Sequence, residues 1–244
     1  MADGIALLCM LHPSSPPAQD RCLSLLRHTA RNYYRQPPAK CTAWSYFLPF
    51  KPLKNQQPSI IGGLEIYTAK SALQSQVDDR EFFQPYHRTV REEGLYAKPE
   101  ELVAWYLTAG FVARSGSTPG SNGRGKEGEG VVISLTTMTC TDRAKALGVL
   151  EDFAPWVQAE EPGVLTYAVF TRPKAREEVM LFVRYEGTKA LKMHSGAAEH
   201  EVVVKKLKEL QKGSETTLWR EVPDSFVEKT EVGVESARVV QSKL

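Results

Sequence analysis

Residues 179–194 read VMLFVRYEGTKALKMH, and this stretch predicts a buried strand followed by a helix. The residues from Val179 to Val183 are all apolar, whereas a strand with one exposed face alternates apolar with polar side chains. Ile5–Cys9 has the same continuous apolar character. Both strands are therefore expected to be covered on both faces, which requires a second layer of structure on each side.

A weaker copy of this unit lies in the first half of the chain. Ala72-Leu73 follows one predicted strand just as Ala190-Leu191 follows another. Three further matches fall in the same order: Asp3-Gly4-Ile5 with Glu129-Gly130-Val131, Asp20-Arg21 with Asp142-Arg143, and Trp44-Ser45-Tyr46 with Leu165-Thr166-Tyr167. The offset falls from 126, between Ile5 and Val131, to 118, between Ala72 and Ala190. The chain is therefore read as a tandem repeat whose register shifts only in loops.

Each copy is predicted to fold as strand, helix, strand, strand, helix, strand. In the first copy we expect strands at Ile5–His12, Cys41–Phe50, Ile60–Thr68 and Leu102–Ala113, and helices at Ala18–Tyr34 and Ser71–Glu93. In the second we expect strands at Val131–Thr139, Val164–Thr171, Val179–Tyr185 and Thr216–Val222, and helices at Asp142–Ala159 and Thr188–Gln211. Thr141-Asp142 is expected to cap the third helix, which ends at Glu161-Pro162-Gly163, and Lys212-Gly213 is expected to close the fourth.

These elements predict an α+β fold in which two four-stranded antiparallel sheets pack face to face with helices outside. The expected organisation is a first repeat over residues 1–114, a glycine-rich linker over 115–130, a second repeat over 131–222 and a tail over 223–244. The linker holds six glycines and no large apolar residue, which is typical of a flexible connector. The two repeats would form a pseudo-dimer within one chain, and a further homodimer stays open.

Charge and cysteine usage exclude several classes of function. The formal net charge is only +2 and no basic stripe is interleaved with aromatic residues, so no nucleic-acid partner is expected. The apolar run Ile5–Leu11 is too short for a membrane span. Cys9, Cys22, Cys41 and Cys140 show neither disulfide-framework nor metal-ligand spacing, which favours a reducing compartment and no metal site.

The second copy resembles the antibiotic biosynthesis monooxygenase family. The resemblance is carried by Glu161-Pro162-Gly163-Val164-Leu165, Tyr167-Ala168-Val169-Phe170, Met180 to Glu186, and Ala190-Leu191-Lys192-Met193-His194. It implies two ferredoxin-like βαββαβ repeats that form an intramolecular dimeric α+β barrel. It also implies monooxygenase activity without a cofactor on an aromatic or polyketide-like small molecule, with dioxygen as the second substrate.

The two copies differ at the positions that carry chemistry in such proteins. His194 fills the family's Ala-Leu-x-x-His position, whereas Gln76 stands there in the first copy, and His200 is matched by Phe82. Haem-degrading relatives pair a first-strand Asn with a second-helix Phe-x-x-x-His. Phe83 to His87 has the second of these elements. Because Ile5–His12 contains no Asn, haem is the less favoured alternative to a site without a cofactor.

Oxygenation without a metal or flavin needs an electron-rich substrate, a dry pocket, a base and donors that hold the resulting anion. We expect His194 and Tyr185 to be catalytic, because histidine accepts protons near neutral pH. The expected substrate-binding residues are Tyr167, Arg184, His200, Trp219, Trp44, Tyr46, Tyr67, His87 and Trp105. His194 and His200 lie six apart on one predicted helix, which is not the spacing of two metal ligands on one face.

Each of these residues also has a structural interpretation. His194 is equally explained as a hydrogen-bonded structural residue, Arg184 as the partner of a helix carboxylate, and Tyr167 and Trp219 as core residues. The first-half aromatic residues form either a second pocket or the larger part of the core. Non-oxidative cyclase, isomerase or decarboxylase activity on the same barrel, and a binding or stress-related role without turnover, stay open as alternatives.

The last three residues are Ser242-Lys243-Leu244. A terminal Ser-Lys-Leu is the tripeptide read by the peroxisomal import receptor. We therefore expect a peroxisomal protein that contacts this receptor through its tail, with a cytoplasmic location as the alternative.

Overall fold

The computed structural model describes residues 4–37, 39–51, 60–114 and 130–229. The first repeat contains β1 (Ile5–Leu11), α1 (Pro16–Thr29), the short π-helix η1 (Ala30–Tyr34), β2 (Cys41–Pro49), β3 (Ile61–Tyr67), α2 (Lys70–Val77), α3 (Phe83–Glu92) and β4 (Glu101–Phe111). The second contains β5 (Val132–Cys140), α4 (Arg143–Glu160), β6 (Val164–Arg172), β7 (Ala175–Tyr185), α5 (Thr188–Gly196), α6 (Ala198–Glu209) and β8 (Gln211–Glu221). A short strand, β9 (Val227–Glu228), follows.

The strands form a closed antiparallel barrel. Their order is β3-β1-β4-β6-β7-β5-β8-β2-β9, and β3 also pairs with β2. Each repeat therefore has the ferredoxin-like order of fourth, first, third and second strand. The fourth strand of each repeat pairs with the second strand of the other, as β4 with β6 and β8 with β2. The predicted intramolecular dimeric α+β barrel is confirmed, with its two sheets joined at both edges.

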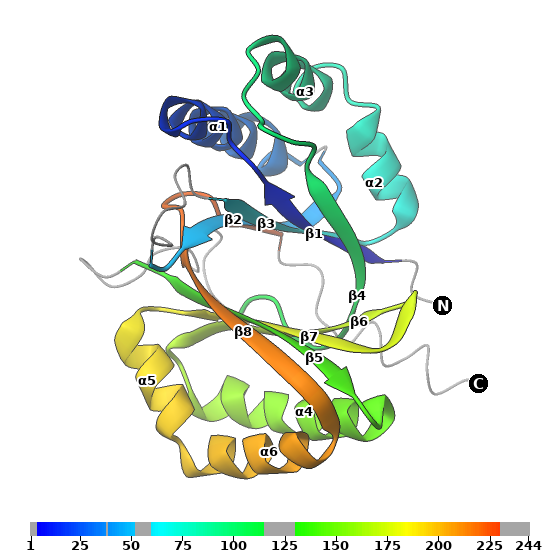
Figure 1. The fold of residues 1–244 in the computed structure, drawn as a ribbon, viewed down its shortest axis with the longest axis vertical. Helices are drawn as coiled ribbons and strands as arrows, with labels where there is room; N and C mark the ends of the chain where they lie inside the picture. The colour runs from blue at the N-terminus through cyan, green and yellow to red at the C-terminus, as the bar shows by residue number, and fades with distance from the viewer. Residues whose placement is uncertain (1–3, 38, 52–59, 115–129, 230–244) are drawn as a thin grey trace.

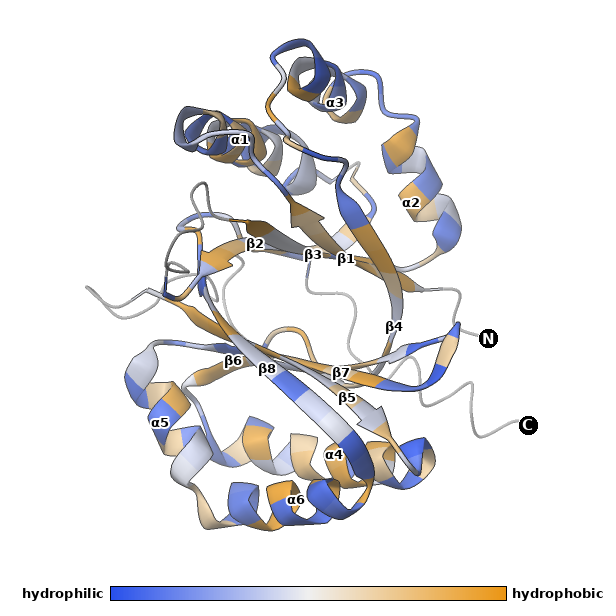
Figure 2. Cartoon of the chain, in the orientation of Figure 1, coloured by the Kyte–Doolittle hydropathy of each residue, from blue (hydrophilic) through white to orange (hydrophobic). Residues whose placement is uncertain are grey.

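The helices lie outside the barrel and create three cores. In Figure 1, α1, α2 and α3 cover the sheet of the first repeat, while α4, α5 and α6 cover the sheet of the second. One apolar core lies under the first set of helices, one under the second set, and one inside the barrel between the sheets. In Figure 2 much of the barrel is orange, whereas the helices mix blue with orange residues. Covered faces on both sides explain the continuous apolar strands.

A glycine permits the close approach of the two sheets where β4 meets β6. Gly110 has φ +86°, and a Cβ atom there would lie 1.9 Å from the backbone oxygen of Tyr167. The β4–β6 register shifts between Leu107 and Ala109. This bulge turns the strand at one of the two junctions that close the barrel, and only glycine fits the space and the dihedral angle.

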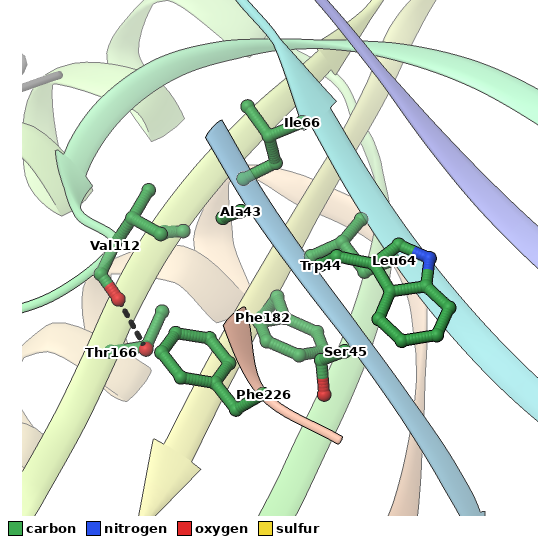
Figure 3. A pocket seen from close by; sticks show the side chains of 10 residues that line it. Ala43, Trp44, Ser45, Leu64, Ile66, Val112, Thr166, Phe182 and Phe226 are labelled. Carbon is green, nitrogen blue, oxygen red and sulfur yellow. Dashed lines mark hydrogen bonds between the residues drawn. The ribbon is translucent and has the colours of Figure 1, made fainter. Parts of the chain in front are cut away.

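The interior of the barrel is held by a buried ion pair between strands. Arg184 on β7 donates from Nε and from Nη2 to the Glu221 carboxylate on β8, over 2.6 and 2.8 Å. Ser45 on β2 donates to the same carboxylate, and the Arg184 guanidinium stacks 3.4 Å from the ring centroid of Phe226. Figure 3 shows Phe226 beside Thr166 and Phe182, where the surrounding side chains leave a space of about 10 Å³. This region is packed and holds no room for a substrate.

The first part of the tail packs on the barrel. β9 pairs with β2, and the Ser225 hydroxyl donates to the Tyr46 carbonyl over 3.0 Å. Arg35 donates to the Asp224 carbonyl over 2.7 Å. Residues 223–229 of the predicted tail therefore pack against β2 and the end of η1. Most of the predicted linker, residues 115–129, and the terminal Ser242-Lys243-Leu244 lie outside the described residues.

Several predicted elements need correction. The helices expected at Ser71–Glu93 and Thr188–Gln211 are each broken in two, as α2 with α3 and α5 with α6. Asp79, which lies inside the helix expected at Ser71–Glu93, accepts hydrogen bonds from the backbone N–H groups of Phe82 and Phe83 at the start of α3. Lys212-Gly213 lies inside β8 rather than at a helix end, because the helix stops at Glu209. Asp142 does cap α4, as predicted.

The pairing of strands also corrects the alignment of the repeats. Tyr67 pairs with Ile5 in the first repeat, and Tyr185 pairs with Val132 in the second. Ile5 therefore corresponds to Val132, one residue beyond the match made from sequence. Trp44 faces Glu65 across the β2–β3 ladder and Tyr167 faces Val183 across β6–β7, so Tyr167 corresponds to Trp44 rather than to Tyr46. Bulges near Thr42 and Leu165 displaced the sequence match.

All four cysteines are buried free thiols, which agrees with the expected lack of a disulfide framework. Within the described ranges, no helix is long and apolar enough to cross a membrane.

Candidate functional site

A cavity of about 120 Å³ lies in the first repeat, between its sheet and its covering helices. The floor comes from β1, β2 and β3, and the roof from α1, η1, α2 and α3. Its lining residues are mostly aromatic or aliphatic: Leu7, Cys9, Leu11, Leu26, Thr29, Tyr34, Trp44, Tyr46, Gly63, Glu65, Leu73, Gln76, Val77, Phe83, Tyr86, His87, Glu100 and Leu102. An enclosed apolar space with few polar groups is the usual form of a small-molecule site.

A carboxylate stands at the floor of this cavity. Glu65 on β3 accepts hydrogen bonds from Trp44 Nε1 at 3.1 Å and from the Tyr67 hydroxyl. Tyr34 and Gln76 lie at 3.4 Å as further donors. Burial raises the pKa of Glu65 above its ordinary value of 4.5, and the hydrogen bonds from Tyr67 and Trp44 oppose that rise. Four neutral donors thus fix the position of a buried acid.

The second repeat has an apolar residue where the first has this acid. Pairing aligns Tyr67 with Tyr185, so Glu65 corresponds to Val183 and Gly63 to Leu181. Val183 and Leu181 pack into the core under α4, α5 and α6. A Cβ atom at Gly63 would meet its neighbours at no less than 3.6 Å, so the space above Gly63 is open. Two of the differences between the repeats therefore lie at the floor of this cavity.

His87 on α3 supplies the second titratable group of the cavity. Its side chain is 31% exposed, and its Nδ1 atom lies 4.0 Å from Oε1 of Glu100. Burial lowers the pKa of His87 below 6.5, while the nearby Glu65 charge acts in the opposite direction. The ring packs against Phe83, with centroids 4.3 Å apart. His87 is therefore a neutral proton acceptor at neutral pH, close to the more exposed edge formed by Glu100 and Leu102.

Two buried polar atoms on lining residues have no hydrogen-bond partner within the described part of the chain. They are Oε1 of Gln76 and the hydroxyl of Tyr46. Both side chains are 2% exposed. A buried polar atom without a partner costs about 1–3 kcal/mol. Since both residues line the cavity, a ligand with hydrogen-bonding groups is the natural way to recover this cost.

The structure places the expected site residues in different parts of the fold. Trp44, Tyr46 and His87 line the first-half cavity, and Tyr67 holds its carboxylate. Trp105, Arg184 and Trp219 lie inside the barrel, where Arg184 pairs with the strand residue Glu221 instead of a helix carboxylate. Tyr167, Tyr185, His194 and His200 lie under or within the helices of the second repeat. Three separate layers therefore hold the eleven expected site residues.

His194 is enclosed in the second-half core. Its Nδ1 atom lies 2.5 Å from Oε2 of Glu161, and its side chain is 4% exposed. The rings of Tyr185 and His200 lie 5.5 and 4.5 Å away between centroids. The break between α5 and α6 brings the two histidines together, although they are not on one helix as expected. Burial is the main cause that lowers the pKa of His200, and the nearby His194 is the second cause.

Sequence reasoning missed Glu65, Gln76, Tyr34 and Glu100 as cavity residues. A signal for Glu65 existed: it is the one charged residue in the predicted strand Ile60–Thr68, and it follows Gly62-Gly63. Ala72 and Ala190 differ by 118 in residue number, and the same difference aligns Glu65 with Val183. This comparison would have identified Glu65 as a charged residue opposite an apolar one. Among the described residues, no group of three or more potential metal ligands lies close enough to hold an ion.

No protein-family model and no curated protein sequence matches the chain. Solved structures do share its fold. A putative monooxygenase from Lactobacillus acidophilus NCFM matches with a TM-score of 0.72 and 13% identity, over 93% of this chain and 96% of that one. A second from Fusobacterium nucleatum matches with a TM-score of 0.73 and 9% identity, over 93% and 95%. An anthrone oxidase-like protein matches with a TM-score of 0.55 and 12% identity, over 90% and 92%. The chain thus has, over nearly its whole length, the barrel fold of proteins named as monooxygenases.

Proposed function

We propose that the protein is a monooxygenase that uses dioxygen to oxidise a small, electron-rich aromatic compound without a cofactor. The observation that carries the proposal is the first-half cavity, which combines aromatic walls with a neutral histidine and a buried carboxylate. The names of the structural neighbours support the reaction class. The mostly apolar lining of the cavity disfavours water, and an oxygen-sensitive anion requires a site with little water.

The size of the cavity limits the substrate to one aromatic ring. Its volume is about 120 Å³, whereas a cavity of about 150 Å³ is known to hold benzene. Because this volume is below that of the benzene-binding cavity, a phenol with one or two small substituents needs the roof helices to move outward. A tricyclic anthrone needs displacement of α2 and α3. A haem macrocycle does not fit either, so the Phe83 to His87 resemblance supports no haem chemistry here.

The proposed reaction takes its electrons from the substrate. His87 accepts the phenolic proton, and the phenolate passes one electron to dioxygen. Recombination at a ring carbon forms a carbon–oxygen bond and gives a hydroperoxide. Loss of the hydrogen on that carbon and cleavage of the oxygen–oxygen bond release water and leave a quinone. One oxygen atom of dioxygen thus enters the product and the other leaves as water.

The chain contributes position and proton transfer to these steps. His87 is held by Phe83 and lies on the roof, where it can accept a proton from a ring that rests on Trp44. Trp44 is itself fixed by stacking on Tyr34, with centroids 4.3 Å apart. The Tyr46 hydroxyl stays protonated because burial raises its pKa above its usual value of 10, so it is available as a donor to the developing anion.

Isotopic labelling tests the proposal. Metal-stripped protein is incubated under ¹⁸O₂ with 2-methoxyphenol, 3-hydroxybenzylamine or anthrone, and oxygen uptake and product mass are followed. We expect one oxygen consumed per quinone formed, one ¹⁸O atom in the product, and faster turnover of the monocyclic compounds. The surface variant Glu93→Gln is the matched control, because Glu93 forms an ion pair with Arg21 and does not line the cavity.

Two outcomes would replace the proposal. Product formed without oxygen uptake would indicate a non-oxidative enzyme that uses the same proton acceptor. Binding without any product would indicate a small-molecule-binding protein.

A further inference from the structure

We propose that the ligand of the first-half cavity carries a protonated amino group, and that this ammonium binds against Glu65. This inference rests on the proposed function in one respect, namely that the ligand is the substrate. The selection of a cation is argued from the cavity itself.

The cavity lining carries two acidic groups, and its basic group is the imidazole of His87. Its lining includes the carboxylates of Glu65 and Glu100, and neither lysine nor arginine occurs among its residues. Every hydrogen bond found at the Glu65 carboxylate comes from a neutral donor, including Trp44 and Tyr67. A buried carboxylate without a positive partner is costly. A cationic ligand removes that cost, whereas a carboxylate or phosphate ligand increases it.

The remaining polar atoms favour a ligand that donates hydrogen bonds. Gln76 gives its amide N–H to Glu65, which leaves its Oε1 atom as an acceptor without a partner in the described structure. The Tyr46 hydroxyl is likewise unpaired and can accept. An ammonium has three donors and no acceptor, which suits the Glu65 carboxylate and the free Oε1 atom of its neighbour Gln76. Glu65 is half-buried as a residue and lines the cavity, so a ligand in the cavity would contact it.

The walls add a second attraction for a cation. Tyr34, Trp44, Tyr86 and Phe83 present aromatic rings around the space. The faces of aromatic rings attract ammonium groups, most strongly where water is excluded. Aromatic walls and a buried acid together form the usual combination for recognition of organic ammonium ions.

The fold itself does not require the acid. The corresponding position in the second repeat is Val183, which packs in an apolar core at 1% exposure. Burial of Glu65 without a cation is expected to lower stability, and the second repeat has a valine at this position. A ligand explains such a residue better than folding does. This comparison within one chain is the strongest argument for a charge-selective site.

Matched ligands test the inference by titration calorimetry on the full chain at pH 7.5. The probes are 3-hydroxybenzylamine, 3-hydroxybenzyl alcohol and 3-hydroxybenzoate, which differ in charge but little in size. We expect the amine to bind at least tenfold more tightly than the alcohol, and the benzoate not to bind measurably. Glu65→Gln should reduce the preference for the amine over the alcohol to twofold or less. The control Glu93→Gln should keep the full preference.

Two further variants locate the binding. Gly63→Leu places in the cavity the side chain that Leu181 places in the second repeat, and should abolish binding of all three compounds. Leu102→Arg adds a cation at a position that is 52% exposed, where folding is unaffected, and should weaken binding of the amine severalfold.

Equal or tighter binding of the alcohol or benzoate by the wild-type protein would overturn the inference, as would a full amine preference in Glu65→Gln. Charge-selective binding without oxygen uptake would refute the proposed function alone, and oxygen uptake without charge selectivity would refute this inference alone.

Discussion

Glu65 on β3 and Val183 on β7 occupy the same position in the two repeats, and each faces the helices that cover its own half. Their neighbours correspond as well, since Trp44 lies opposite Glu65 and Tyr167 opposite Val183. The barrel therefore contains an internal comparison in which one copy carries a buried acid and the other does not. The proposed ligand site rests on this difference between the copies.

The buried acid should make stability depend on pH. Burial raises the pKa of Glu65 in the folded protein, so the unfolded chain loses the proton first as pH rises above about 4.5. Stability from this group is present below that pH and is lost as pH rises through the folded pKa. We expect Glu65→Gln to raise the melting temperature at pH 7.5, with a gain that shrinks as pH approaches 4.5. A gain that grows toward acid pH would contradict this assignment.

The proton acceptor should be visible in the rate profile. Because burial lowers the pKa of His87, kcat/KM should be constant near neutral pH and fall as pH drops through a midpoint below 6.5. His87→Gln should lower the rate by about 10²–10⁴ and remove this acid limb. A limb that persists in His87→Gln would show that another group accepts the proton.

The ion pair inside the barrel should be structural rather than catalytic. Arg184→Met leaves the Glu221 carboxylate buried without its cation, which costs about 3–5 kcal/mol in the free energy of unfolding. The double variant Arg184→Met with Glu221→Leu should recover most of that loss. Chemical denaturation measures both values. If the double variant is no more stable than the single one, the packing of Phe226 on the guanidinium carries the stability instead.

The terminal tripeptide makes a localisation prediction. A fluorescent protein fused ahead of the chain should enter peroxisomes in a eukaryotic cell, and deletion of Ser242-Lys243-Leu244 should leave it diffuse. An equally diffuse signal from both fusions would place the protein in the cytoplasm.

The fold was predictable from sequence because its strands are apolar on both faces and its matches recur in order. The bulges at Thr42 and Leu165 were not predictable, since one extra residue in a strand leaves no local signal. The helix breaks were missed for a different reason. Asp79 was assigned to a helix surface, but its carboxylate binds the backbone N–H groups that begin α3.

The candidate site was only partly predictable. Trp44, Tyr46 and His87 were identified by residue type, but aromatic residues are as common in cores as in pockets. Whether a space stays open depends on the sum of side-chain volumes around it. The decisive difference, Gly63 in place of Leu181, becomes visible only once strand pairing aligns the repeats. The weight placed on His194 came from the resemblance, and the structure encloses that residue in a core.

The most direct test of the account is the initial rate of oxygen uptake by three variants that assign the chemistry to one repeat. Gly63→Leu and His87→Gln alter the first-half cavity, while His194→Gln gives the second repeat the residue that the first has at Gln76. We predict that the first two lose at least 99% of the wild-type rate and that folded His194→Gln keeps it within about threefold. Loss of the rate in His194→Gln, with Gly63→Leu still active, would place the reaction in the second repeat and contradict the account.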